Sequence, residues 1–577
     1  MRLRSHHLAL LLLAVLVAAC IGQNPTSTNT PLPPTATPII PTAAPEPTPA
    51  PTAIPATPVA PVTGLPTGTG GYPWWNDAIF YEIFVRSFYD SNGDGIGDLN
   101  GLTAKLDYLN DGDPDTTTDL GVTGLWLMPI QPAASYHGYD VTDYYAINPD
   151  YGTLDDFKRL LNEAHKRGIR VLIDWVPNHS SDQHPWFKAA QDPQSSYRDW
   201  YVWSPESKGS GWHRGASGEY YYGYFWEGMP DLNYTNPAVG EQMRDVARFW
   251  LSDVGVDGFR IDAIKYLIEE GGRSEHTPST HTWLKAFHSV YKSLKPDALM
   301  VGEIWDSSGL VADYTKADDE LDLGFDFNLA HAIVSAAAYR NNRLFNEALT
   351  RDVAVFSPGQ FATFITNHDQ DRVMSMLGED VPRAKVAAAL LLASPGVPFI
   401  YYGEEIGMLG RKPDPSIRVP MQWTADPNGG FTSANFPWMS LNSDYITKNV
   451  AAEAGDPASL WSFYRDLIRL RNEHAALRVG ETYVLDVGKN DTLVAMLRAT
   501  DDEAVLIVVN LGKEPVSDYG LTLAASPLRG NYAAAPLLGA EAFVPLTADA
   551  SGALASYQPL STLPPYSTFI VQLQSMP

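Results

Sequence analysis

Short apolar runs alternate with amphipathic stretches through most of the chain after Tyr72. Apolar runs of four to eight residues bounded by turn residues predict buried strands, whereas apolar residues three or four positions apart predict helices. We predict strands at residues 78–88, 124–129, 170–176, 258–262, 299–304, 324–328, 362–366 and 399–402.

Helical spacing recurs between these strands. In residues 153–169, one helical face carries apolar side chains, and Thr153 is placed to cap the first turn. Further helices are predicted at residues 239–251, 282–294, 383–393 and 460–477. Strands and helices in alternation predict an α/β fold, a parallel (β/α)8 TIM barrel. An open doubly wound sheet is the alternative, although no Gly-rich dinucleotide loop follows any strand.

Two regions depart from this alternation. Residues 179–236, after the third strand, lack helical periodicity and are rich in Trp, Tyr, Gly and Ser, which predicts an inserted subdomain. After residue 478 the pattern becomes β-rich with turn residues between the runs. We therefore predict a catalytic barrel at 71–478, domain B at 179–236 and a C-terminal antiparallel β-sandwich at 479–577.

The first seventy residues are not globular in composition. Arg2 and Arg4 precede an uncharged apolar run that is too short for a membrane span and is typical of a signal peptide. The run ends in "VAAC", which resembles the lipobox of bacterial lipoproteins and predicts a signal peptide in residues 1–20 that is cleaved directly before Cys20, which then carries the lipid; ordinary secretion is the alternative. Residues 21–70 contain 14 prolines and one charged residue, Glu46, so we predict a disordered, extended linker.

The composition of the chain indicates which classes of binding partner it suits. The chain has 577 residues, a formal net charge of -27 and one cysteine. The acidic surface disfavours nucleic acid and anionic membranes and suits a neutral ligand. A single cysteine excludes an intrachain disulfide. We expect a monomer outside the cell, attached to the outer face of a bacterial membrane only through its lipid, or secreted.

Four of the predicted strands end in polar residues that could take part in catalysis or bind a ligand. They are Asp174 with Asn178 and His179, Arg260 with Asp262, Glu303, and Asn367 with His368 and Asp369. The C-terminal ends of parallel barrel strands share one face, where active sites lie. Paired carboxylates suit glycoside hydrolysis, because one attacks the anomeric carbon and the other protonates the leaving oxygen. A structural ion pair could explain Arg260 and Asp262 alone, but four such sets favour a site.

The segments "RVLIDWVPNH", "VDGFRIDAIKY", "LMVGEIW" and "ATFITNHDQDR" resemble, in order and spacing, the four conserved regions of the α-amylase family, glycoside hydrolase family 13. The resemblance covers residues 74–477. It implies that Asp262 is the nucleophile, Glu303 the general acid/base and Asp369 a transition-state stabiliser. The residues it implies for substrate binding are Tyr139, His137, His179, Arg260, Lys265, His368 and Arg372, and Asp174 is implied to support the site.

Specificity signals are mixed. "MPDLN" (229–233) resembles the fifth region of neopullulanase-like and intermediate members, and Lys265 resembles a lysine that endo-amylases use beyond the cleavage point. "IRVPMQW" (417–423) and "YYGEEIGM" resemble α-glucosidases. The combination is similar to intermediate, often lipid-anchored bacterial α-amylases, so we expect endo-hydrolysis of α-1,4 bonds in starch and maltooligosaccharides. An α-glucosidase, neopullulanase, cyclomaltodextrinase or glucosyltransferase is the alternative.

The loop "DSNGDGIGD" (90–98) predicts a calcium site. Oxygen ligands occupy positions 1, 3, 5 and 9 of an EF-hand-type loop and Gly95 occupies position 6, although the usual glutamate at position 12 is Gly101. An acidic turn without an ion is the alternative. Similar loops in α-glucosidase relatives bind Ca2+, which is the cofactor we predict. The predicted ligands are Asp90, Asn92, Asp94, the carbonyl of Ile96, and Asp98. The resemblance to many amylases also implies a second ion near Asn178, although Tyr266, the residue after Lys265, departs from the family pattern.

Overall fold

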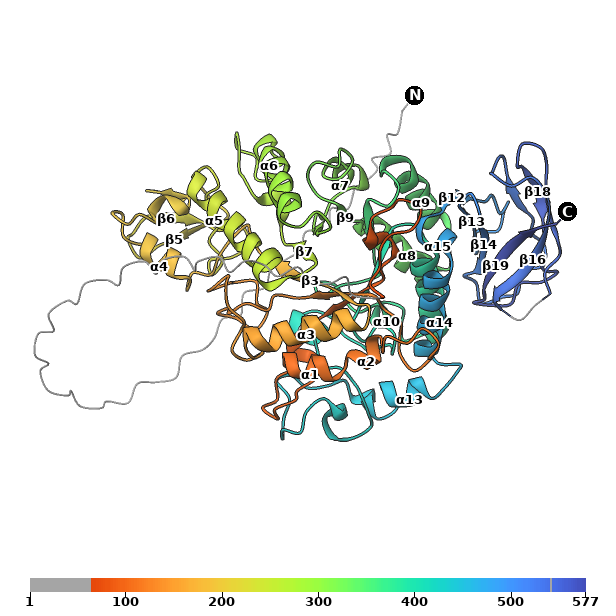
Figure 1. The fold of residues 1–577 in the computed structure, drawn as a ribbon, viewed down its shortest axis with the longest axis horizontal. Coiled ribbons are helices and arrows are strands. Elements are labelled where there is room, and N and C mark those ends of the chain that lie inside the picture. Colours follow the sequence, from red (N-terminus) through yellow and green to blue (C-terminus); the bar gives the residue numbers. More distant parts are fainter. Residues whose placement is uncertain (1–63, 540–541, 577) are drawn as a thin grey trace, which may run out of the picture. The chain divides into compact units, whose positions relative to one another are not determined.

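The computed structural model describes residues 64–539 and 542–576 (Figure 1). The predicted signal peptide, Cys20 and most of the predicted linker lie outside the described residues. Among the described residues, no helix has both the length and the apolar character that crossing a membrane requires.

Eight parallel strands close into a barrel, as predicted, in the order β1-β11-β10-β9-β8-β7-β3-β2. The strands are β1 (Phe80–Ile83), β2 (Gly124–Leu127), β3 (Arg170–Trp175), β7 (Gly258–Ile261), β8 (Leu299–Gly302), β9 (Leu323–Phe325), β10 (Phe361–Thr363) and β11 (Val397–Tyr401). Several are shorter than predicted. After β1 the chain turns into a 3-10 helix, Val85–Ser87, so its apolar residues are explained by burial rather than by an extended backbone.

Apolar side chains fill the barrel interior. Phe80 of β1 and Phe399 of β11 are register neighbours and stack with ring centroids 4.5 Å apart. Trp126 of β2 lies above them, 6.2 Å from the Phe399 ring and 5.1 Å from the Arg260 guanidinium. The packed interior is a rigid floor, so polar side chains one layer nearer the C-terminal ends of the strands are held in fixed positions.

Helices cover the outside of the barrel (Figure 1). Thr153 caps α3 through a capping box with Asp156, as its sequence position predicted. The longer helices are α3 (Leu154–Lys166), α5 (Pro237–Arg248), α6 (Pro278–Leu294), α8 (Phe327–Tyr339), α9 (Arg343–Val355), α11 (Val381–Ala393) and α14 (Leu460–Glu473). The shorter helices are α1 (Leu99–Ala104), α2 (Leu106–Leu109), α7 (Ser308–Asp313), α10 (Val373–Met376), α12 (Asp414–Ile417), α13 (Val450–Ala454) and α15 (Ala475–Val479).

Two further units are built onto the barrel chain. Between β3 and α5 lie helix α4 (Pro185–Ala190) and a three-stranded antiparallel sheet of β4 (Trp203–Ser204), β6 (Tyr220–Tyr222) and β5 (Trp212–Arg214). The C-terminal region forms a six-stranded antiparallel sheet and a two-stranded sheet that share one apolar core. Its strands are β12 (Glu481–Val484), β13 (Leu493–Ala499), β14 (Ala504–Asn510), β15 (Leu521–Leu523), β16 (Gly530–Leu538), β17 (Leu546–Ala548), β18 (Leu554–Tyr557) and β19 (Thr568–Ser575).

The predicted end of the linker at residue 70 is wrong. Residues 64–70 are bound to the barrel: the Gly68 amide and the Thr69 hydroxyl donate to Asp77, and Arg170 donates to the Pro66 carbonyl. Composition could not show this, because the partners come from distant positions of the chain. Asp77 precedes β1 and Arg170 begins β3, so the chain joins the barrel at the N-terminal ends of its strands.

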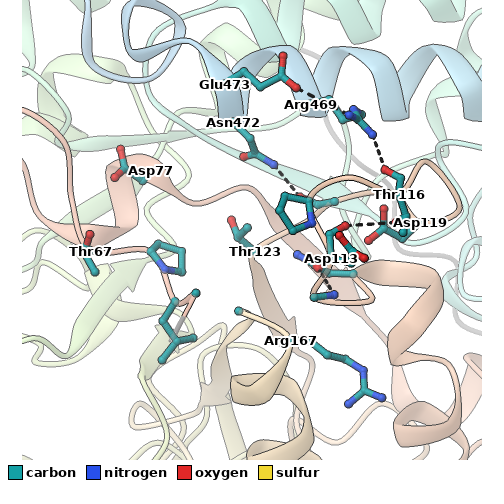
Figure 2. A pocket seen from close by; sticks show the side chains of 18 of the residues that line it. Thr67, Asp77, Asp113, Thr116, Asp119, Thr123, Arg167, Arg469, Asn472 and Glu473 are labelled. Atoms are coloured by element: carbon teal, nitrogen blue, oxygen red, sulfur yellow. Dashed lines mark hydrogen bonds and ion pairs between the residues drawn. The ribbon is translucent and has the colours of Figure 1, made fainter. Parts of the chain in front are cut away.

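A cavity of about 460 Å³ opens at this N-terminal face (Figure 2). Its wall includes Thr67, Asp77, Thr123 and Arg469, and none of the predicted catalytic or sugar-binding residues lines it. The predicted catalytic carboxylates lie at the other ends of the strands. This cavity therefore belongs to the region where the chain enters the barrel and not to the candidate active site.

Candidate active site

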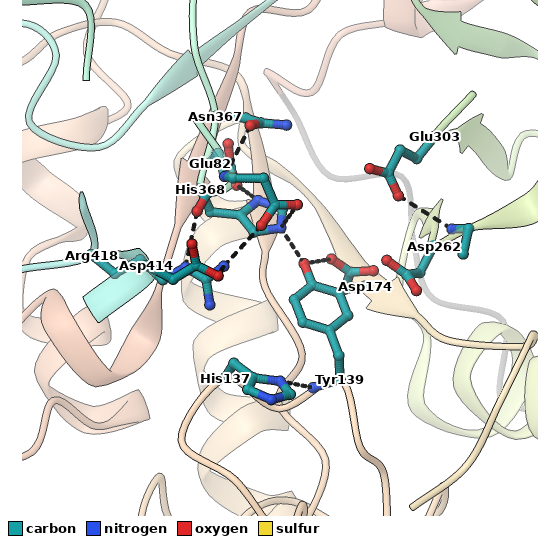
Figure 3. A network of polar contacts seen from close by, with 12 residues as sticks. Glu82, His137, Tyr139, Asp174, Asp262, Glu303, Asn367, His368, Asp414 and Arg418 are labelled. Carbon is teal, nitrogen blue, oxygen red and sulfur yellow. Dashed lines mark hydrogen bonds and ion pairs between the residues drawn. The ribbon is translucent and has the colours of Figure 1, made fainter. Parts of the chain in front are cut away.

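The predicted catalytic residues converge at the C-terminal ends of the strands (Figure 3). Asp174 lies within β3 and Arg260 within β7, and the two are register partners in neighbouring strands. Asp262 directly follows β7, and Glu303 directly follows β8. Because the strands are parallel and adjacent, residues far apart in the sequence are brought to one end of the barrel.

Arg260 contacts all three carboxylates of this group. One terminal nitrogen donates to both oxygens of Asp174, at 2.9 and 3.1 Å, and to Asp262 Oδ1 at 2.8 Å. The other lies 2.9 Å from Glu303 Oε2. Glu303 Oε2 also accepts a hydrogen bond from the main-chain amide of Ala263, at 3.2 Å. A planar guanidinium bound to three carboxylates explains how buried charges are tolerated in β7.

Different interactions act on the pKa of the two candidate catalytic carboxyls, Asp262 and Glu303. Burial raises the pKa of both Asp262 and Glu303, and the charge of Arg260 opposes that rise in each. Asp262 accepts a well-aligned hydrogen bond from the charged Arg260, whereas Glu303 accepts one from the neutral Ala263 amide, and the charge-assisted bond favours the ionised form more strongly. Asp262 is therefore better suited to act as a nucleophile, and Glu303 to retain a proton. Burial likewise raises the pKa of Asp174, to about 7.

Asp369 is held as an anion on the other side of the pocket. Its Oδ2 lies 3.2 Å from His368 Nε2, and its Oδ1 accepts a hydrogen bond from Arg418 at 2.9 Å. Although burial opposes ionisation, His368 and Arg418 hold the pKa of Asp369 well below its usual range. Burial also disfavours a charged His368, but Asp369 and Glu82 raise its pKa to about 9. The His368–Asp369 pair is thus charged at neutral pH.

Aromatic and imidazole side chains complete the wall. The Tyr139 hydroxyl lies 3.0 Å from Asp174 Oδ2 and 2.6 Å from His368 Nε2. His137 Nδ1 accepts a hydrogen bond from the Tyr139 amide. His179 is buried, which lowers its pKa to about 4, and its Nε2 has no hydrogen-bond partner among the described residues. This nitrogen is itself buried, so it is unpaired among the described residues without being open to a sugar hydroxyl.

Lys265 has protein partners instead of an open position. Its ammonium lies 3.0 Å from the Trp305 carbonyl, 2.8 Å from Glu275 and 3.5 Å from Asp306. Together with His276, these two acidic residues are the one group of three metal-type ligands found in the described part of the chain. The lysine ammonium already supplies a cation there. The substrate-binding role implied for Lys265 by resemblance stays a prediction.

Arg372 is placed differently from the other predicted residues. It is buried, it donates to the main-chain carbonyls of Ile417 and Tyr402, and its guanidinium lies over the rings of Tyr401 and Tyr402. Arg418, which was not predicted as a site residue, pairs with Asp369. Glu82 was also missed; its Oε1 lies 2.5 Å from His368 Nδ1. Charged residues inside the apolar runs "FYEIF" and "SIRVP" were the available signals.

Exchanging Arg418 for methionine tests this assignment. Arg418→Met removes a cation that binds Asp369 and favours its ionised form, so we expect kcat/KM at neutral pH to fall by about 10- to 100-fold. Arg372→Met is the matched control, and it should lower the melting temperature while kcat/KM of the folded protein stays near the wild-type value. A wild-type kcat/KM in Arg418→Met would contradict the assignment.

The predicted calcium loop is wound by hydrogen bonds between side chains and main chain. Asp90, Asn92 and Asp94 each accept from the amide two residues further on, at 3.0, 2.9 and 2.8 Å, and Asp98 caps α1. Asp90 and Asp98 are buried. The carboxylates of the loop do not approach one another as closely as those around Lys265. The available donors are carboxylate, amide and carbonyl oxygens, which fit Ca2+ and not a softer metal.

Comparison with known proteins agrees with this geometry. The family described as "Alpha amylase, catalytic domain" matches residues 82–480. The chain is 41% identical over 450 residues to Alpha-amylase 3 of Dictyoglomus thermophilum, which covers 76% of this chain and 86% of that protein. It is 36% identical over 523 residues to the Trehalose synthase/amylase TreS of Mycolicibacterium smegmatis, covering 78% and 86%.

A solved structure extends the comparison to three dimensions. The crystal structure of the alpha-amylase from H.orenii matches with a TM-score of 0.75 and 41% identity, over 86% of this chain and 99% of that chain. The barrel, the carboxylates at the ends of its strands and the family match over most of the chain lead to one conclusion. The chain belongs to the α-amylase family, glycoside hydrolase family 13.

Proposed function

We propose that this protein is an extracellular α-glucan hydrolase that cleaves internal α-1,4 bonds of starch and maltooligosaccharides with retention of configuration. The observation that carries the proposal is the contact of Asp262 and Glu303 with the same guanidinium, that of Arg260. Retaining glycosidases hold their carboxyl groups about 5–5.5 Å apart, and inverting enzymes about 6.5–9.5 Å apart. Because Asp262 and Glu303 contact the same guanidinium, they suit the shorter carboxyl spacing of a retaining enzyme.

The reaction then follows in two steps. Asp262 attacks the anomeric carbon while Glu303 donates its proton to the glycosidic oxygen, and the bond to the leaving sugar breaks as the Asp262 ester forms. Glu303, now ionised, accepts a proton from water, and the water oxygen displaces Asp262 from the sugar. Asp369 and His368 bind hydroxyls of that sugar, and the resemblance to the family implies that His179 binds the same ring.

Sequence motifs and the named relatives support the proposed linkage and position of cleavage. "MPDLN" favours an intermediate amylase, and the relatives named above are an alpha-amylase and a trehalose synthase/amylase. Starch, pullulan and cyclodextrin should each be followed over time by product analysis and viscometry. Early maltooligosaccharides from starch with a rapid fall in viscosity are expected. Glucose as the sole early product would favour an α-glucosidase, and a new disaccharide formed from maltose would favour a glucosyltransferase.

We further propose that the 90–98 loop binds one Ca2+ ion through Asp90, Asn92, Asp94, the Ile96 carbonyl and Asp98. The ion would offset the repulsion between the carboxylates and fix the loop. Calcium at about 100 times its Kd stabilises a protein by about 2.7 kcal/mol. Because the unfolding entropy of a fold of this size is about 1 kcal/mol/K, EDTA should lower the melting temperature by about 3 °C. Asp94→Ala should abolish this difference, and Asp502→Ala, in an exposed hairpin turn, should keep it. A melting temperature that EDTA leaves unchanged would contradict the site.

Location completes the proposal. Lipidation of Cys20 would place the enzyme on the outer face of a bacterial membrane, with residues 21–63 as a spacer. The chain joins the barrel at the N-terminal ends of the strands, and the carboxylates lie at the other ends. A polymer would thus reach the pocket from the side opposite the attachment. Cell fractionation should find Cys20→Ser protein in the medium and wild-type protein in the membrane.

A further inference from the structure

Residues 431–438, which we call the strap, lie against the 90–98 loop. The Asp90 amide donates to the Phe431 carbonyl at 3.0 Å, and the Trp438 amide donates to the Gly95 carbonyl at 2.8 Å. Thr432 donates from its hydroxyl to Asp90 Oδ2. A Cβ on Gly95 would meet the Phe436 carbonyl oxygen at 2.6 Å, and φ of Gly95 is +93°. The glycine therefore allows the strap to approach the loop this closely.

Trp438, at the end of the strap, contacts two segments of the sugar-site wall. Its indole nitrogen donates to Ser87 Oγ at 3.0 Å, and its ring stacks on Tyr136 with centroids 5.5 Å apart and planes 27° apart. It also packs edge-on against Phe84 at 5.8 Å. The Arg86 guanidinium also lies 5.7 Å from the centroid of the ring. A large half-buried ring with four side-chain neighbours and a satisfied N–H has one well-defined position.

Each contact leads onward to a residue of the pocket. Tyr136 packs edge-on against His137, which accepts from the Tyr139 amide (Figure 3). Ser87 donates to the main-chain carbonyl of Arg418, whose guanidinium binds Asp369. The Arg418 guanidinium also lies 6.0 Å from the Tyr136 ring. Trp438 thus supports both the Tyr139 side and the Asp369 side of the same sugar position without contacting either residue.

We propose that Trp438 is a positioning residue for the sugar bound at the cleavage point, and that it couples this subsite to the 90–98 loop. It aligns Tyr136 and Ser87, and through them it aligns His137, Tyr139 and Arg418. The coupling to the loop rests on the proposed calcium site, whereas the alignment of the pocket does not. The substrate class remains an α-glucan whose sugar ring is held by Tyr139 and Asp369.

The contacts that hold the strap on the 90–98 loop differ from the contacts by which Trp438 supports the pocket. Its attachment to Asp90 uses the Phe431 carbonyl and the Thr432 hydroxyl, so that attachment does not depend on the Trp438 side chain. Replacing the indole should therefore release Tyr136 and Ser87 and leave the strap on the loop. Phe436, two residues earlier in the strap, is 82% exposed and makes no aromatic contact among the described residues. It provides a matched control position.

The test uses the full chain in the Asp262→Asn background, which should keep its affinity for maltotriose and cleave it at least about 10⁴-fold more slowly than the wild type. Maltotriose is titrated by calorimetry into this protein, alone and with Trp438→Leu, Trp438→Phe or Phe436→Leu added. We expect Trp438→Leu to bind maltotriose about five- to tenfold more weakly, because two walls of the subsite lose their alignment. Trp438→Phe keeps a ring on Tyr136 and should recover part of the affinity. Phe436→Leu should match the background protein.

The same substitutions in the active enzyme separate positioning from general loss of structure. Trp438→Leu should raise KM more than it lowers kcat, because it loosens groups that bind the sugar before and during the reaction. Maltotriose affinity and KM equal to those of Phe436→Leu would overturn the proposal. If Trp438→Leu does not fold, Trp438→Phe takes its place, and wild-type values for that variant would overturn the proposal equally.

A calcium series separates this inference from the calcium site itself. With EDTA replaced by CaCl2, maltotriose affinity should rise in the Phe436→Leu protein and stay constant in the Trp438→Leu protein, because coupling passes through the indole. A rise of equal size in both proteins would overturn the coupling. If CaCl2 changes no melting temperature in any variant, the proposed calcium site fails and the coupling fails with it, and the comparison in EDTA decides the positioning role alone.

Discussion

Asp262→Asn should reduce kcat on maltooligosaccharides by about 10⁴-fold or more, because an uncharged amide cannot form the ester with the anomeric carbon. The side chains are nearly the same size, and Asp174 and Glu303 still contact Arg260. The fold and the affinity for maltotriose should therefore persist. Turnover is measured by product formation, and binding by calorimetry on the same preparation.

Asp155→Asn is a suitable control for this substitution, because Asp155 is an exposed carboxylate in the first turn of α3. It should have wild-type turnover. Asp262→Asn protein that retained more than a small fraction of wild-type turnover would show that another group attacks the sugar. Loss of maltotriose binding together with turnover would instead point to a purely structural role for the Arg260–Asp262 pair.

Glu303→Gln should lower kcat by about 10²- to 10⁴-fold on maltotriose, because the leaving sugar oxygen must then depart without a proton. A nitrophenyl leaving group needs no such help. On a nitrophenyl maltoside the first step should stay fast while the second, which needs Glu303 as a base, becomes slow. A sugar ester on Asp262 should then accumulate and be detected by mass spectrometry of the digested protein.

Comparing the two leaving groups tests whether Glu303, and not Asp262, donates the proton to the leaving oxygen. The rate of the first step is compared, which on the nitrophenyl substrate is the initial burst of nitrophenol. Equal losses of this rate on maltotriose and on the nitrophenyl substrate would remove Glu303 from the role of proton donor. Glu347→Gln, on the exposed side of α9, is the matched control and should leave both rates unchanged. For the wild type, a proton-donating Glu303 also predicts a loss of kcat/KM as pH rises through its pKa, which burial raises.

The pattern along the chain predicted the barrel because strand and helix periodicities are local properties. Each β-strand of the barrel was predicted, and the main errors were in length, as after β1, where burial and extension produce the same apolar run. Arg260 and Asp262, two positions apart in a strand, predicted a shared face. Their meeting with Glu303 followed from the single fact that parallel strands end on one side.

Partners from distant loops could not be predicted in this way. Asp369 and Arg418 are 49 residues apart, and no periodicity links them. Arg372 follows Asp369 by three residues and was the nearer candidate, yet its side chain turns to the carbonyls of Ile417 and Tyr402. Which of two arginines reaches the carboxylate depends on the path of the loop after β11.

The same limit applies to Lys265 and to the edge of the linker. Resemblance predicts that Lys265 binds substrate, and only the fold shows that its ammonium contacts Glu275, Asp306 and the Trp305 carbonyl. By itself, then, the sequence determined the barrel, the order of its strands along the chain and the residues at their ends, because those depend on neighbours in the chain. Only the tertiary structure decided which charges pair, because ion pairs and hydrogen bonds form between loops whose separation in space the sequence does not specify.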